Sequence, residues 1–135
     1  MINYKIFKPS YIEKNKNYDN IYLVVGLMKK LKYVIKRNKK TIDSSYTNYI
    51  ERENTIIFNY NKIKIIIDLD NRSFIRETND DYLYLSKDDS YIKLKLENYK
   101  FNTDLKFFNF IVKDDIKINY QIKGDNEEVE LIISF

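Results

Sequence analysis

From Thr55 onward, short apolar stretches alternate with polar turns along the chain. The turns recur roughly every 8 to 12 residues, a spacing typical of hairpins in an all-β sandwich or barrel. Asn and Asp supply most of them, because these residues tolerate left-handed backbone and the chain has only two Gly. The pattern predicts an all-β, mainly antiparallel meander of about 8–10 strands. We expect it to close into an up-and-down barrel as one domain over 1–135, with at most short helix in the N-terminal part.

The alternation is clearest near the C-terminus. In "IKINYQIK" the residues Ile116, Ile118 and Tyr120 share one face, with polar residues between them. After the turn "GDNEE", the apolar positions Leu131 and Ile133 again share a face. Residues 116–135 are therefore predicted to form a β-hairpin.

Two features depart from simple alternation. In "YIKLKLENYKF" (91–101) the apolar positions change parity, which predicts a β-bulge near Glu97-Asn98. The stretches 63–69 and 105–112 are nearly apolar at every position, so both faces of these strands are expected to be covered by protein. A helix or the N-terminal segment could provide the second cover.

The N-terminal third allows more than one interpretation. Residues 2–7 alternate as a strand would, and residues 9–20 form a polar connection. Residues 21–37 fit either a helix with an apolar stripe or strands in which Leu31, Tyr33 and Ile35 alternate with polar residues. Strands are favoured, with a break near Lys29-Lys30, because β-branched and aromatic residues are abundant here.

The sequence from Thr55 to Phe135 resembles the C-terminal part of a small calycin-like β-barrel family of uncharacterised bacterial proteins. The resemblance lies in the order "IKIIIDLDNRSFIRE", "YLYLSKDDSYIKLKLENYKF" and "DDIKINYQIKGDNEEVELIISF". The tight turn with Pro and Gly that precedes "YIKLKL" in the family is replaced by residues 86–90. The resemblance implies a lipocalin-type barrel, and it supplies no catalytic residues.

The composition excludes several kinds of chemistry. The chain has no Cys and no His, so it has no thiolate nucleophile, no Ser/His/Asp triad and no usual zinc ligands. Its two Gly, Gly26 and Gly124, are too far apart for a phosphate-binding loop. Four carboxylate pairs lie in predicted turns, where capping is a simpler role than catalysis: 80–81, 88–89, 114–115 and 127–128. We therefore expect a protein that is not an enzyme and uses no metal or cofactor.

The aromatic residues are the first candidates for binding. The chain has 13 Tyr and 8 Phe. Tyr60, Tyr84, Tyr99 and Tyr120 could line a barrel cavity for a small apolar ligand, since a Tyr combines an apolar ring with a hydroxyl. The alternative is that these rings simply fill the core, because small barrels have little free interior. In that case the barrel would act as an interaction module.

The basic residues are the second candidates. Residues 1–40 carry eleven Lys/Arg and two acidic residues, whereas 41–135 carry thirteen and eighteen. Such asymmetry is typical of a surface that binds phosphate, with nucleic-acid contacts from Lys29, Lys30, Lys32, Lys36 and Arg37. However, the chain has 20 Lys, 21 Ile and 16 Asn but no Ala, which indicates AT-rich codons. The favoured interpretation is therefore that the Lys residues form a solvated strand face, or that the basic N-terminal part complements the acidic remainder.

Neither a secretory signal nor a membrane span is expected. The longest apolar run, Ile21 to Met28, is far shorter than the roughly 20 residues that span a bilayer. It is also followed by no small-residue cleavage site. These features predict a cytoplasmic protein, and they leave its oligomeric state open.

Overall fold

The computed structural model describes residues 29–135, and these form one antiparallel sheet of eleven strands. The strands are β1 (Lys29–Arg37), β2 (Lys40–Arg52), β3 (Thr55–Tyr60), β4 (Ile63–Asp68), β5 (Ser73–Glu77), β6 (Asp81–Leu85), β7 (Ser90–Leu94), β8 (Tyr99–Asn102), β9 (Leu105–Val112), β10 (Ile116–Ile122) and β11 (Glu128–Ser134). No helix occurs among these residues. The predicted all-β antiparallel meander is confirmed.

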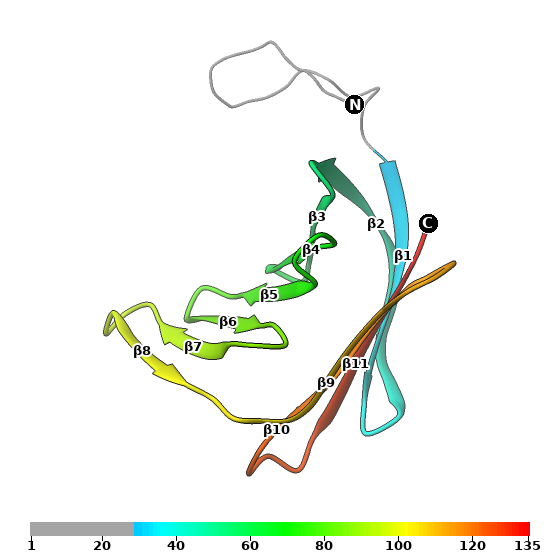
Figure 1. Ribbon diagram of the computed structural model, residues 1–135. Coiled ribbons are helices and arrows are strands. Elements are labelled where there is room, and N and C mark those ends of the chain that lie inside the picture. The colour runs from blue at the N-terminus through cyan, green and yellow to red at the C-terminus, as the bar shows by residue number, and fades with distance from the viewer. Residues whose placement is uncertain (1–28) are drawn as a thin grey trace, which may run out of the picture.

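The sheet is strongly curled, as Figure 1 shows. Its order is β8-β7-β6-β5-β4-β3-β2-β1-β11-β10-β9, so the C-terminal strand β11 lies beside β1. The strands β8 and β9 are consecutive in the chain, yet they lie at the two edges of the sheet. The result is a half-barrel, in which strand pairing does not join the two edges.

Contacts across the interior hold the curl. The rings of Phe74 on β5 and Tyr120 on β10 lie 5.9 Å apart between centroids, although six strand-to-strand steps separate β5 from β10 in the sheet. Arg72, in the turn before β5, donates a hydrogen bond of 2.8 Å to the carbonyl oxygen of Phe110 on β9. These contacts bring the inner faces of the two halves together.

The connection between β8 and β9 partly closes the opening. The backbone N–H of Thr103 donates to the carbonyl of Ser90 at 3.1 Å, and the N–H of Lys123 donates to the carbonyl of Asp104 at 2.8 Å. Two adjacent residues thus link the start of β7 to the end of β10. In a closed barrel, paired strands would join the two edges of the sheet. Here the connection between β8 and β9 runs across the opening instead.

The core follows from the two-residue repeat. On β1 the buried residues are Leu31, Tyr33 and Ile35, and the residues between them face outward. The same alternation places Ile56 and Phe58 on the inner face of β3. Removing a side chain of this size from water contributes roughly 1.5–3 kcal/mol to stability.

The hairpin predicted over 116–135 is confirmed as β10 and β11, with Gly124 at a positive φ of 87° in its turn. The bulge predicted near Glu97-Asn98 is wrong. Residues 95–98 form a turn, Asn98 has a φ of 51°, and Leu94 pairs with Tyr99. The parity changes because the chain reverses, and this extra hairpin raises the strand number to eleven.

The two interpretations of the N-terminal stretch are decided only in part. Residues 29–37 form a strand, as favoured. The predicted strand over 2–7, the connection over 9–20 and residues 21–28 lie outside the described residues.

Candidate ligand cavity

A cavity of about 550 Å³ opens at one end of the half-barrel. Four of the hairpins whose turns lie at this end contribute to its lining: β1–β2, β3–β4, β5–β6 and β10–β11. Side chains from the inner faces of the strands form an apolar wall, and side chains near the turns form a polar rim. The apolar wall includes Ile35, Ile65, Phe74, Leu83, Tyr120 and Leu131. The rim consists of Arg37, Asp43, Asn61, Arg76, Asp81, Asp125 and Glu127.

Tyr120 is the deepest polar side chain in this lining. Its side chain is buried, with 7% of the residue exposed, because β10 places it between Ile118 and Ile122 on the inner face. Its hydroxyl has no hydrogen-bond partner among residues 29–135, yet its oxygen is not sealed in the core as that of Thr103 is. Burial raises its pKa to about 12, despite the opposing charge of Arg76. Tyr120 therefore offers a neutral O–H donor to the cavity.

Tyr60, at the end of β3, stands near this hydroxyl. Burial raises the pKa of Tyr60, whereas the positive charge of Arg76 acts in the opposite direction. The ring of Tyr60 lies 5.1 Å from that of Tyr33 between centroids. Arg76 influences the pKa of both Tyr60 and Tyr120, so the guanidinium and the two hydroxyls belong to one polar cluster.

The two rim arginines are only loosely paired. Arg76 Nη1 lies 4.0 Å from Asp81 Oδ1, and Arg37 Nε lies 3.4 Å from Glu127 Oε1. Both distances exceed those of a short charge-assisted hydrogen bond, which are about 2.7–2.9 Å. Within residues 29–135, each guanidinium therefore keeps donors available for a group that enters the mouth.

The rim carboxylates are better satisfied. Asp43 Oδ2 accepts hydrogen bonds from Asn61 Nδ2 at 2.9 Å and from the Tyr33 hydroxyl at 3.3 Å. Burial raises the pKa of Tyr33, and the charge of Asp43 raises it further. At the polar end of the cavity, the carboxylate of Asp43 thus already accepts hydrogen bonds, whereas Arg37 and Arg76 have N–H donors available.

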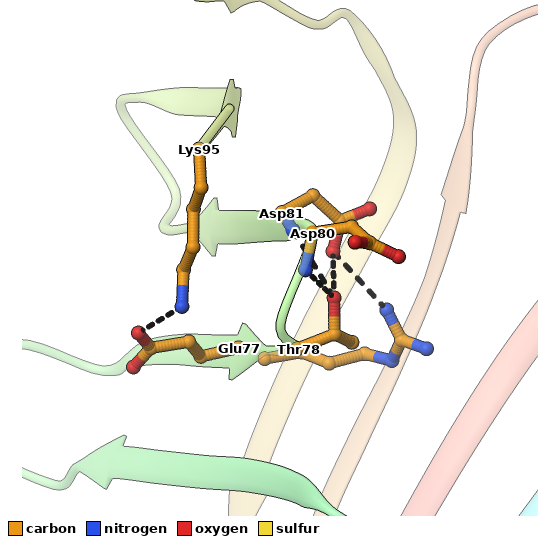
Figure 2. Close-up of polar contacts among 6 residues, drawn as sticks. Glu77, Thr78, Asp80, Asp81 and Lys95 are labelled. Atoms are coloured by element: carbon orange, nitrogen blue, oxygen red, sulfur yellow. Dashed lines mark hydrogen bonds and ion pairs between the residues drawn. The ribbon is translucent and has the colours of Figure 1, made fainter. Parts of the chain in front are cut away.

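Asp81 is held by the β5–β6 turn, which Figure 2 shows. The Thr78 hydroxyl donates to Asp81 Oδ1 at 2.9 Å and accepts from the backbone N–H groups of Asp80 and Asp81 at 3.1 Å each. Lys95, directly after β7, contacts Glu77 Oε2 on β5 through its Nζ at 2.6 Å, across the intervening strand β6. The pair Asp80-Asp81 therefore shapes a turn, the role favoured from the sequence.

The structure separates the four tyrosines named from the sequence. Tyr60 and Tyr120 lie in the cavity lining, whereas Tyr84 and Tyr99 do not. Tyr84 has the opposite parity to buried Leu83 and Leu85, so it lies on the outer face. Tyr99 begins the edge strand β8 and is 57% exposed. The sequence pattern did not reveal the turn before β8, and so it did not reveal this exposure.

The basic residues named from the sequence are not one group. Lys30, Lys32 and Lys36 lie on the outer face of β1, whereas Arg37 lines the cavity. Lys29 Nζ lies 3.9 Å from Glu51 on β2, and Lys32 lies over the ring of Tyr46. A shallow depression of about 430 Å³ on the outer face brings Lys36, Lys39 and Lys117 together with Glu128 and Glu130. Carboxylates thus interrupt the basic surface.

The sequence interpretation missed Arg76 and assigned Arg37 to a different surface. The missed signal is strand parity. Arg37 follows Leu31, Tyr33 and Ile35 at two-residue steps, and Arg76 follows Phe74 in the same way. An Arg that continues the buried face at the end of a strand is positioned at the mouth of a barrel.

Within residues 29–135, no cluster of three or more acidic side chains is arranged to hold a metal ion. Asp68, one of the turn residues, accepts hydrogen bonds from the N–H groups of Asp70 at 3.0 Å and Asn71 at 3.1 Å. The described part of the chain also has no helix that is long and apolar enough to cross a membrane.

Comparison with known proteins gives no family for this chain. No protein-family model matches it, and neither do curated protein sequences or solved structures.

Proposed function

We propose that this chain is a non-catalytic, calycin-like binding protein that takes a small apolar molecule with a hydrogen-bond-accepting end into the half-barrel cavity. The observation that carries the proposal is the Tyr120 hydroxyl, which is buried in an apolar lining and has no partner among the described residues. The hydroxyl oxygen is open to the cavity, so in the free protein it is satisfied by water. An acceptor on a ligand would replace that water and form its hydrogen bond in apolar surroundings.

The size of the cavity supports the same function. Its volume of about 550 Å³ lies within the roughly 300–1,000 Å³ that is usual for small-molecule pockets. Apolar side chains line its inner part and seven polar side chains form its rim, which suits a molecule with an apolar body and one polar end. Tyr120, Tyr60, Arg37 and Arg76 provide donors at that end.

Binding is favoured over catalysis because the polar cluster has no group suited to proton transfer near neutral pH. The pKa of Tyr120 is about 12, and burial also raises the pKa of Tyr60. A general acid or base works best when its pKa is near the working pH. The two tyrosines therefore position a ligand better than they would transform one.

The test uses three aliphatic compounds of equal chain length that end in a methyl, a hydroxyl or a carboxylate group. Each compound competes with a fluorescent apolar probe for the full chain. We expect the hydroxyl and carboxylate compounds to bind more tightly than the methyl compound. Failure of the probe and of all three compounds to bind would contradict the proposed function.

Variants then locate the site. Tyr120→Phe removes only the hydroxyl, so it should weaken the hydroxyl and carboxylate compounds roughly threefold to tenfold and leave the methyl compound unchanged. Arg76→Gln should weaken the carboxylate compound most, by roughly threefold, because the guanidinium is partly exposed and shared with Asp81. Tyr84→Phe and Arg52→Gln, away from the cavity, are the matched controls and should change nothing.

A further inference from the structure

The outer face of the sheet carries a continuous apolar row across six strands. Register pairs each member with the next, from Ile50 on β2 to Ile57, from Ile57 to Ile66, and from Ile66 to Ile75. The row continues through Tyr84 on β6 to Tyr91 on β7. We call the set Ile50, Ile57, Ile66, Ile75, Tyr84 and Tyr91 the outer apolar row.

These side chains remain accessible in the described structure. Ile50 is 49% exposed, and the other five members are half-buried. The rings of Tyr84 and Tyr91 stack with their centroids 5.1 Å apart, and Lys100 Nζ lies 4.2 Å from the centroid of Tyr91. Large apolar patches with polar margins usually mark a surface that contacts another segment or molecule.

Polar residues border the row on both sides. On one side, register pairs Lys64 with Glu77 and Lys93 with Lys100. On the other side, Asp68 pairs with both Thr55 and Ser73. Tyr82, which pairs with Glu77 and Lys93 and stacks on Tyr91, interrupts the first of these borders. The apolar surface is therefore about one side chain wide over β2 to β5 and wider at the tyrosines, and it runs across the strands.

The chain contains a segment suited to this row. The residues before β1 end in the uninterrupted apolar run Ile21 to Met28, directly before Lys29. Lys29 pairs with Tyr49, which is the neighbour of Ile50 at one end of the row. The apolar run therefore begins beside the surface that its side chains could cover.

The lengths also agree. Strands in a sheet lie about 4.8 Å apart, so the three steps from β1 to β4 span about 14 Å along the backbone, and more on the convex outer face. Eight residues reach at most about 26–29 Å. A run that leaves β1 at Lys29 is thus long enough to cover the row as far as Ile66 on β4.

We propose that the outer apolar row is the docking surface for this chain's own residues 21–28. The N-terminal segment would then cover the part of the row nearest to β1, on the outer face of β2 to β4. The cavity would remain open, because it lies on the inner face of the sheet. This proposal does not rest on the proposed function.

The test exploits the absence of native Cys. Gly26→Cys combined with Lys64→Cys places one thiol in the run and one at the margin of the row. Gly26→Cys combined with Ser134→Cys is the matched control. Ser134 is on β11, next to β1, whereas Lys64 is on β4, three strands from β1. A freely moving segment would therefore reach Ser134 at least as easily as Lys64.

Dilute full-length protein is treated with a short bis-maleimide, and mass spectrometry separates cross-links within one chain from cross-links between chains. We expect the Lys64 pair to cross-link within one chain at a yield several times that of the Ser134 pair. Equal yields would overturn the proposal. So would cross-links formed only between chains, which would identify a second copy as the occupant.

A third variant tests the apolar contact itself. Adding Ile66→Thr to the Lys64 pair keeps a β-branched residue in the strand and should lower the cross-link yield severalfold. An unchanged yield would overturn the proposal. Far-UV circular dichroism of every variant confirms that the sheet is intact, and Asp68→Cys on the opposite margin replaces Lys64→Cys if that variant does not fold.

Discussion

The two faces of the curled sheet carry similar residues but have different surroundings. On β4, Ile65 and Ile67 point inward and are 1% and 0% exposed, whereas Ile66 between them points outward and is half-buried. The inner isoleucines pack in a core to which both halves of the sheet contribute. Among the described residues, the outer isoleucine pairs with Ile57 and Ile75 of the outer apolar row. The curvature of the sheet, more than residue type, decides which apolar residue stabilises the fold and which remains available for contact.

The largest expected effect compares neighbouring residues on the two faces. Ile67→Ala should lower the free energy of unfolding by about 2–5 kcal/mol, because it leaves a cavity in a fully buried site. Ile66→Ala should cost about 1 kcal/mol or less, because the site is already partly hydrated. Urea denaturation of both variants gives the comparison. Equal losses would contradict the assignment of the two faces.

A second comparison uses alkaline pH and two tyrosines on opposite faces. The folded pKa of Tyr120 is raised from 10.0 to about 12, so below pH 10 it is neutral in both states and its contribution to stability is complete. Between pH 10 and 12 the unfolded chain loses this proton first, and stability falls. Two pKa units correspond to a loss of roughly 2–3 kcal/mol.

The measurement is urea denaturation at several pH values for the original chain, Tyr120→Phe and Tyr84→Phe. Tyr120→Phe should reduce the loss of stability between pH 10 and 12, whereas Tyr84→Phe on the outer face should keep most of it. If both variants respond alike, the hydroxyl of Tyr120 is not buried as described.

The smallest expected effect concerns the basic residues of β1. Changing Lys29, Lys30, Lys32 and Lys36 together to Gln should leave the weak binding of labelled single-stranded and duplex oligonucleotides nearly unchanged at low salt. The reason is that carboxylates lie among these side chains: Lys29 is paired with Glu51, and Glu128 and Glu130 lie beside Lys36. A marked loss of affinity, with a shallower salt dependence, would instead support nucleic-acid binding through this strand.

The sequence revealed strands and their parity wherever one face is buried. The alternation of Ile116, Ile118 and Tyr120 predicted the face of β10, and it placed Tyr120 among the candidates for the cavity. The alternation could not reveal the turn at 95–98. A β-bulge and a short hairpin both change the parity of the apolar positions, so the sequence pattern is the same for both.

The position of the arginines was less accessible to sequence analysis. Arg37 lies in a basic stretch of the sequence. It was therefore assigned to an exposed basic surface and not to the inner face of β1. The contact between Phe74 and Tyr120 depends on the curl of the sheet, which joins strands far apart in the chain. Local patterns do not contain that information.

The most direct test of the binding account is a crystal structure of the full chain with the carboxylate-ended aliphatic compound. The account predicts the compound inside the half-barrel, with a carboxylate oxygen within about 3.2 Å of the Tyr120 hydroxyl oxygen and near Arg76. An empty cavity at saturating compound, or a compound bound only to the outer face, would contradict it.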